Sequence, residues 1–168
     1  MKNRLTLPLL VVVLFFSNTT LAEGPPVFST WEGFEADKLA SIWLIKRHIE
    51  PGARILIYPK NEEIDKGISF DTPYSDIKRD RMRSTYESLL AHYGLDDPRL
   101  VNLGKIIHDI EINVWEKKVY RKSSRVRLCI LDLMEKHSDQ TSLLEGAEQY
   151  FDDLYENMPA ELEMNARP

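Results

Sequence analysis

The sequence contains a single cysteine, Cys129, among its 168 residues. One cysteine cannot form an internal disulfide, and it excludes a redox enzyme that works with its own pair of thiols. We therefore expect the fold to depend on an ordinary hydrophobic core. Cys129 itself falls on the apolar face of an expected helix, which indicates packing rather than chemistry.

The sequence also lacks the short motifs that mark many enzyme classes. It has no glycine-rich phosphate-binding loop, no GxSxG nucleophile elbow, no CxxC pair and no HExxH metal motif. No fingerprint of a flavin or nicotinamide site is present either. These absences exclude the corresponding enzyme signatures and leave open whether the protein catalyses a reaction.

Positive charge is in deficit, since 22 Lys and Arg residues face 27 Asp and Glu residues, for a net charge of −5. An acidic protein is a poor general binder of nucleic acid or of an anionic membrane surface. We therefore expect neither among the partners of the mature chain. The basic residues gather in two runs, Lys78–Arg83 and Arg121–Arg125, which either form solvated surface or hold an anion.

The longest apolar run lies at the beginning of the chain. Two basic residues precede the apolar segment Leu5–Phe16, and Thr20–Ala22 places a small residue at a cleavage position. This order is typical of a secretory signal peptide, and the run is too short to span a bilayer comfortably. We predict a signal peptide at residues 1–22, a single domain at residues 23–168 and a periplasmic location. Cleavage brings the net charge to about −7, because it removes two positive charges.

Periodicity and capping signals predict a compact, mostly α (α+β) domain of about five helices with one short β pair. Each expected helix combines an apolar stripe with a start or stop signal; the helices cover residues 35–49, 84–93, 97–111, 123–134 and 142–158. Two short apolar runs, 54–58 and 68–71, predict the β pair. Residues 23–34 are interpreted as an irregular lead-in.

Four expected helix starts carry a capping signal. Residues 84–87 and 142–145 match the capping box, in which two residues satisfy each other's free backbone N–H groups. Asp97 is placed to cap the third helix, and Ser123 or Ser124 to cap the fourth.

Two expected helices carry polar groups on otherwise apolar faces. At 3.6 residues per turn, Asp37, Ser41 and His48 share a stripe of the first helix, and His108 and Glu111 share one of the third. A carboxylate or imidazole on a buried helix needs a partner, a metal ion or water. We therefore predict that these two helices cross and that their polar groups form one pocket.

The candidate site residues divide into a ligand-binding group and a metal-binding group. The first combines hydroxyl, carboxylate and basic side chains, and its basic members favour a tetrahedral oxyanion. Its members are Asp37, Lys38, Ser41, Arg47 and Arg79. The second places an imidazole and a carboxylate one turn apart, which suits a divalent metal ion but also a purely structural polar pair. Its members are His108, Asp109 and Glu111.

Several short stretches occur in a characteristic order between residues 31 and 111. They are Trp31–Gly33, Asp37–Pro51, Phe70–Pro73, Tyr86–Leu90, Tyr93–Pro98 and Ile107–Glu111. Together they resemble the chromate-resistance exported-protein family, whose domain also forms the C-terminal part of chromate-sensing regulators. The likeness fades beyond Asn113. The resemblance implies a role in lowering chromate accumulation.

One segment departs from that family. Many members carry histidine in a Ser-His-His-Gly-like segment before the central helix, whereas this chain has Lys78-Arg79-Asp80-Arg81. If that histidine ligates a metal ion in the family, this chain has lost a ligand or binds an anion instead.

These observations favour an exported periplasmic protein of the chromate-resistance type that binds a small anion, such as chromate, or a metal ion. One alternative is a metal-dependent enzyme, in which the imidazole and the carboxylates hold a divalent ion beside open positions for water or substrate. Another alternative is a non-catalytic protein-interaction module that uses Trp115, Tyr120 and the C-terminal tail.

Overall fold

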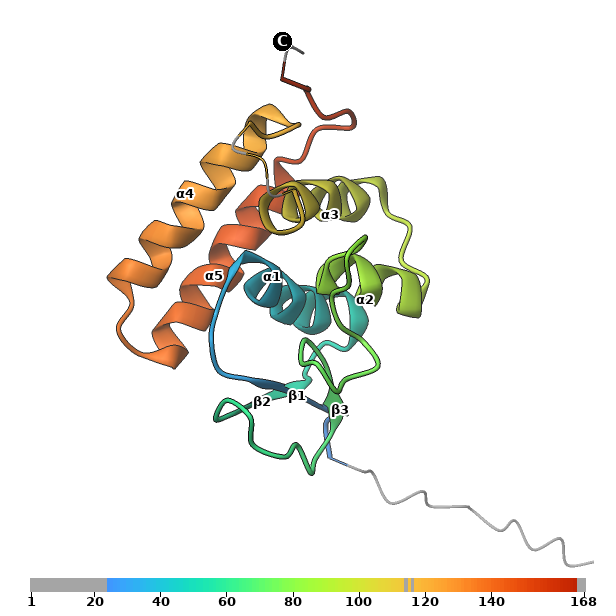
Figure 1. The fold of residues 1–168 in the computed structure, drawn as a ribbon, viewed down its shortest axis with the longest axis vertical. Coiled ribbons are helices and arrows are strands. Elements are labelled where there is room, and N and C mark those ends of the chain that lie inside the picture. The colour runs from blue at the N-terminus through green and yellow to red at the C-terminus, as the bar shows by residue number, and fades with distance from the viewer. Residues whose placement is uncertain (1–23, 114, 116, 166–168) are drawn as a thin grey trace, which may run out of the picture.

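The computed structural model describes residues 24–113, 115 and 117–165, and the predicted signal peptide at residues 1–22 lies outside them. Within these residues the chain forms three short strands and five α-helices, the first of which continues into a π-helical turn (Figure 1). In chain order the elements are β1 (Val27–Trp31), α1 (Ala36–Leu44), η1 (Ile45–Ile49), β2 (Arg54–Tyr58), β3 (Ile68–Ser69), α2 (Thr85–Tyr93), α3 (Pro98–Glu111), α4 (Arg121–Lys136) and α5 (Gln140–Glu156). The predicted mostly helical fold with a small β part is confirmed. Across the part of the chain that the structure describes, no helix is both long and apolar enough to cross a membrane.

The sheet is parallel, with strand order β2-β1-β3. β1 pairs with β2 from Val27 opposite Arg54 to Trp31 opposite Tyr58, and β3 pairs with the other edge of β1. The predicted pairing of 54–58 with 68–71 is therefore wrong, because each segment pairs with β1, which we expected to be irregular. Four of the five β1 residues are buried, and a strand covered on both faces lacks the alternation that identifies strands in a sequence.

Helix α1 occupies the centre of the molecule, and each of its nine residues is buried. It packs against α2, α3 and α5, while α4 lies outside α3 and α5 and the sheet lies at one end (Figure 1). Large buried side chains such as Trp43, Phe70 and Phe151 build the core around it. Because α1 is covered on every side, its charged residues Asp37 and Lys38 need partners inside the protein.

Two helix starts follow the predicted capping signals. The capping box of Ser84 and Glu87 starts α2, and Gly94 caps its C-terminal end with a φ of 64°, the left-handed conformation that glycine favours. α3 begins at Pro98, with Asp97 accepting the N–H groups of the first turn. These two capped starts fix α2 and α3, the helices that flank the candidate site.

Two other helix starts differ from the prediction. α4 has Tyr120 as its N-cap without a side-chain hydrogen bond, so the predicted caps Ser123 and Ser124 lie inside the helix. α5 begins after Asp139, whose carboxylate accepts the N–H of Ser142 at 2.9 Å. Asp is as good an N-cap as Ser, and the earlier start adds residues to the helix.

Candidate functional site

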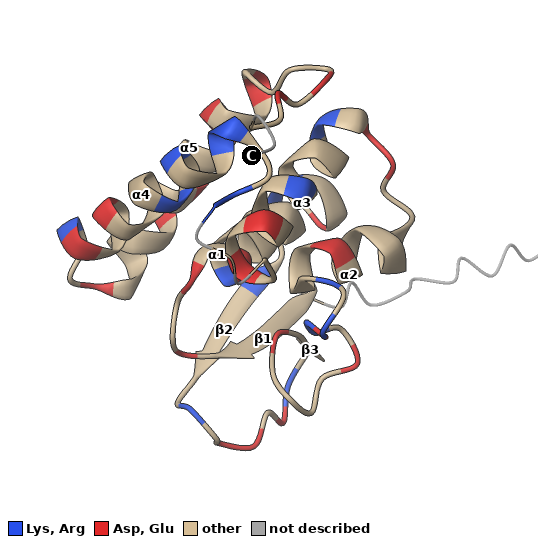
Figure 2. Ribbon diagram, turned by 45° about the horizontal axis from the view of Figure 1, so that its top comes forward, with Lys and Arg blue, Asp and Glu red and all other residues tan. Residues whose placement is uncertain are grey.

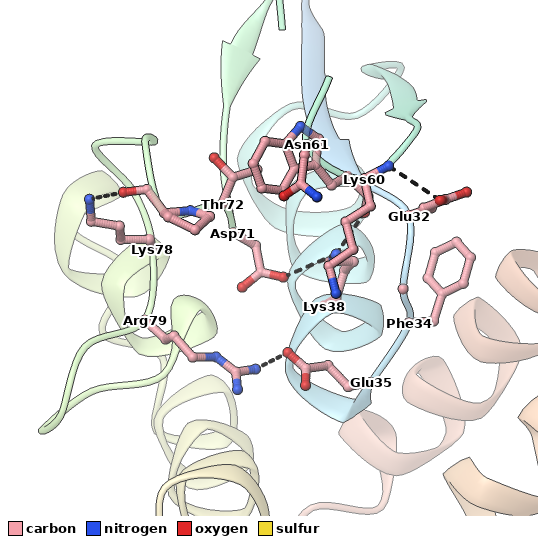
Figure 3. A pocket seen from close by; sticks show the side chains of 13 residues that line it. Glu32, Phe34, Glu35, Lys38, Lys60, Asn61, Asp71, Thr72, Lys78 and Arg79 are labelled. Carbon is pink, nitrogen blue, oxygen red and sulfur yellow. Dashed lines mark hydrogen bonds and ion pairs between the residues drawn. The ribbon is translucent and has the colours of Figure 1, made fainter. Parts of the chain in front are cut away.

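A cleft of about 750 Å³ opens beside the end of β1, and we call it the Arg79 cleft (Figure 3). The turn from β1 into α1, the first turn of α1, the loop after β2 and the loop between β3 and α2 line it. Its lining residues are Trp31, Glu32, Gly33, Phe34, Glu35, Lys38, Lys60, Asn61, Asp71, Thr72, Pro73, Lys78 and Arg79. Four of these residues are basic and three are acidic, so the cleft is richer in positive charge than the chain as a whole.

Lys38 is the most deeply buried basic residue of the cleft, with 4% of its surface exposed. Its ammonium donates to the backbone carbonyl of Trp31 at 2.6 Å and lies 3.5 Å from the carboxylate of Asp71 (Figure 3). Asp71 also accepts a hydrogen bond from the hydroxyl of Thr85 at 2.6 Å. An ammonium has three donors, so these two contacts leave one N–H of Lys38 for a ligand.

Arg79 lies among three carboxylates that come from α1, α3 and the residue before α1. Its guanidinium is hydrogen-bonded to Glu35 and lies 3.5 Å from Asp37 and 3.9 Å from Glu111. The side chain is nevertheless 34% exposed, and it borders the cleft (Figure 3). A guanidinium carries five N–H donors in a rigid fork, so it suits an oxyanion even while it keeps a carboxylate partner.

The carboxylates around Arg79 are crowded. Burial raises the pKa of Glu35, although Arg79 lowers it, and the nearby Glu111 and Asp71 raise it further. Burial likewise raises the pKa of Glu111, against the opposing effect of Arg79 and with a contribution from Asp37. Burial and mutual repulsion thus work against the charged form of these carboxylates, and Arg79 offsets this effect only in part.

Asp37 is fully buried and bonds to the N-terminus of α2. Its two carboxylate oxygens accept the backbone N–H groups of Thr85 at 2.7 Å and Tyr86 at 2.9 Å. Burial raises its pKa to about 6, although these hydrogen bonds and Arg79 favour the charged form. Asp37 thus fills the anion-binding position at the N-terminus of α2 and anchors that helix to α1.

The predicted metal ligands do not come together. His108 Nδ1 lies 2.9 Å from a carboxylate oxygen of Glu87, whereas Glu111 accepts the backbone N–H of Ala36 at 3.1 Å. Asp109 points away from the stripe that His108 and Glu111 share, and along this stripe α3 passes α2 at His108 and the start of α1 one turn later at Glu111, so the three side chains contact three different parts of the protein. Among the residues that the structure describes, no three His, Cys, Asp or Glu side chains form a group that can hold a metal ion.

Asp109 holds the segment between α3 and α4. Its carboxylate accepts the backbone N–H groups of Val119 and Tyr120 at 3.0 Å each and the amide of Asn113 at 2.7 Å. Burial opposes the charge, but these hydrogen bonds outweigh it and lower the pKa of Asp109. Trp115 is 75% exposed, so backbone hydrogen bonds to Asp109, rather than this aromatic ring, hold the segment.

Three predicted ligand-binding residues do not line the Arg79 cleft: Asp37, which holds α2, and Ser41 and Arg47. Ser41 is buried, and no residue in the described part of the chain hydrogen-bonds its hydroxyl. Arg47 pairs with Glu148 and Asp152 of α5, at 3.0 Å in each case. Figure 2 shows charged residues of both signs on α4, whereas the charged residues of α5 are all acidic. The acidic face of α5 thus holds the end of the first helix.

The predicted pocket between the two helices forms only in part. Asp37 and Glu111 approach each other through Arg79, and Lys38 and Arg79 line the cleft itself. His108 lines a separate cavity of about 500 Å³ that includes neither Asp37 nor Arg79. Glu35 carries no signal in the sequence, because its contact with Arg79 is set by tertiary structure. The one available signal for Asp71 is its place in a family-like stretch, Phe70–Pro73.

Comparison with known proteins supports the family resemblance of the short stretches between residues 31 and 111. Residues 28–158 match the family described as ChrB, C-terminal domain. Protein ChrB of Cupriavidus metallidurans is 31% identical over 87 residues, which cover 51% of this chain and 27% of that protein. The chain thus spans about a quarter of the length of this relative. No solved structure matches this chain. The match includes the C-terminal part in which the motifs fade, and it confirms the resemblance at the level of the family: this chain belongs to the ChrB C-terminal domain family.

Proposed function

We propose that this protein lowers chromate accumulation by binding a tetrahedral oxyanion, chromate or a close analogue, in the Arg79 cleft. The observation that carries the proposal is the gathering of Lys38, Lys60, Lys78 and Arg79 around one cleft of an acidic protein. Basic side chains from a helix and two loops that converge on one cavity raise the local concentration of an anion and donate hydrogen bonds to it.

An oxyanion suits this site better than a metal ion. The donors of Lys38 and Arg79 face the cleft, whereas the predicted metal ligands His108, Asp109 and Glu111 are each bonded to other parts of the protein. A resident divalent ion needs several ligands that converge on one point. The alternatives of a metal-dependent enzyme and of an interaction module have no comparable support.

We further propose that binding takes place in the periplasm. The signal-peptide pattern at residues 1–22 supports this location. Mass spectrometry of the protein recovered from a periplasmic extract tests it: we expect the chain to begin at Glu23, and a retained Met1 would contradict export by cleavage.

Isothermal titration calorimetry of the purified protein with chromate tests the binding site. We expect saturable heat with the wild type and a loss of affinity of about tenfold or more in Arg79→Gln, because a charged hydrogen-bond donor is worth about 1.5–3 kcal/mol. Arg47→Gln is the matched control, since Arg47 is similarly exposed and also pairs with carboxylates but lies outside the cleft. Its affinity should equal that of the wild type. Absence of heat with the wild type, or equal losses in both variants, contradicts the proposed site.

A further inference from the structure

The Arg79 cleft presents hydrogen-bond acceptors beside its donors. Glu35 and Asp71 lie next to the basic groups, and both line the same cavity as Arg79 and Lys38 (Figure 3). A carboxylate repels an oxyanion that has only acceptor oxygens. It accepts a short, strong hydrogen bond from an oxyanion that still carries an O–H group. The cleft can therefore contact an O–H group of a bound anion as well as its negatively charged oxygens.

Glu35 is the acidic residue best placed to make this contact. It is the N-cap residue of α1, but its side chain does not cap the helix, so the carboxylate is free to act elsewhere. That carboxylate contacts Arg79 and is 39% exposed, in contrast to Asp71, which is 6% exposed. The charged groups that face Glu35 are Arg79, Glu111, Asp71 and Lys38.

The oxyanions differ in the proton that they carry near neutral pH. Phosphate and arsenate hold at least one proton, chromate takes one up close to neutrality, and sulfate holds none. An oxyanion with one O–H group donates it to Glu35 while its other oxygens accept from Arg79 and Lys38. Sulfate has no donor for Glu35, which leaves a carboxylate and a dianion in contact without a shared proton.

We infer that Glu35 makes the Arg79 cleft selective for protonated tetrahedral oxyanions, such as hydrogenphosphate, hydrogenarsenate and hydrogenchromate, over sulfate. This inference rests on the proposed oxyanion site and adds the chemical class that it accepts. Glu35 acts here as a specificity-determining acceptor, and Arg79 and Lys38 supply the charge.

Calorimetric titration of the purified protein with phosphate and with sulfate, at neutral pH and equal ionic strength, tests the inference. We expect the wild type to bind phosphate about tenfold or more tightly than sulfate, the factor that one charge-assisted hydrogen bond supplies. Glu35→Gln keeps the shape of the side chain but removes its charge, and it should bring the ratio of the two affinities close to one. Glu148→Gln is the matched control, because Glu148 also pairs with an arginine but lies outside the cleft, and it should keep the wild-type ratio.

The outcomes separate the inference from the function on which it rests. Equal affinities of the wild type for phosphate and sulfate overturn the selectivity, and this result does not depend on whether Glu35→Gln folds. A phosphate preference that persists in a folded Glu35→Gln variant overturns the role of Glu35. Binding of chromate together with either result leaves the proposed function standing, whereas absence of binding of every oxyanion contradicts the function and the inference together.

Discussion

Asp37 shows how a single buried charge positions the candidate site. The carboxylate has no exposed surface, and it joins α1 to the first two N–H groups of α2. The helix N-terminus supplies partial positive charge and Arg79 supplies a full charge at 3.5 Å. Even so, burial prevails and the pKa rises to about 6. Asp37 thus aligns α2, and the free energy that its burial costs depends on pH, because burial opposes the charged form.

We predict that Asp37→Asn changes the pH dependence of stability. The pKa of Asp37 lies at about 6 in the folded protein, above its ordinary value of 3.8, so the folded state binds this proton more tightly than the unfolded state. The stabilisation that comes from protonated Asp37 is therefore lost as the pH rises from about 4 through about 6. The Asn variant has no group that titrates at this position, so its stability does not change for this reason. The stability advantage of the wild type over Asp37→Asn should shrink by up to about 3 kcal/mol between about pH 4 and pH 7.

Urea denaturation of both proteins at the two pH values measures this difference. An advantage that stays constant between them would show that Asp37 is not held in a charge-opposing environment. The comparison with Asn isolates this group from the carboxyls whose pKa values fall on folding, such as Asp109 and Asp152, because these are present in both proteins.

At this scale the sequence predicts that a residue needs a partner but does not identify that partner. Asp37 stands on an apolar helix, and this position alone indicates a buried carboxylate with a specific contact. The partner of Asp37 is the backbone of residues 85 and 86, and a contact to the backbone does not show in the identity of the side chains there. His108 illustrates the same limit, since its partner Glu87 already had a predicted role in the capping box.

Among the elements, β1 connects the sheet to the candidate site. It is the central strand, and Trp31 at its end borders the cleft. Gly67 precedes β3 and allows that edge strand to approach β1 closely. Its φ is 75°, and a Cβ atom there would lie 2.4 Å from the backbone oxygen of Val27. Only glycine fits this approach.

We predict that Gly67→Ala destabilises the protein by about 3 kcal/mol or more, because backbone strain and a backbone clash add. Gly52→Ala is the matched control. Gly52 also has a positive φ, of 101°, but nothing lies within 4 Å of the added Cβ. Gly52→Ala should lower the free energy of unfolding only by the backbone strain, about 1–2 kcal/mol. Chemical denaturation of both variants decides the matter, and equal losses would contradict the close approach of residue 67 to β1.

Helices were easier to predict than strands for physical reasons. α2 and α3 carry caps and apolar stripes that act locally, so their starts follow from a few neighbouring residues. β1 lacks alternation because it is covered on both faces, and its partners are remote in the sequence. The end of the first helix also departs from α-helical spacing. The π-helical turn at Ile45–Ile49 changes the spacing there, and His48 lies against the rings of Trp43 and Tyr155.

At the scale of the whole molecule, Arg47 and Arg79 stand at the centres of separate charge clusters with different roles. Arg47 joins η1 to α5 through Glu148 and Asp152, and it lies outside the Arg79 cleft. Arg79 stands in the loop between β3 and α2, where it faces carboxylates on one side and a cavity on the other. Both arginines are predicted as ligand-binding residues because each stands beside other basic residues in the sequence. Only the tertiary fold separates them.

The location of bound chromium tests the central proposal most directly. Anomalous X-ray diffraction from crystals of the protein grown with chromate identifies chromium without assumptions about the site. We predict a chromium peak in the Arg79 cleft, with chromate oxygens within hydrogen-bonding distance of Arg79 and Lys38. A peak found only elsewhere, such as beside Arg47, or no peak at a chromate concentration that saturates the protein, would contradict it.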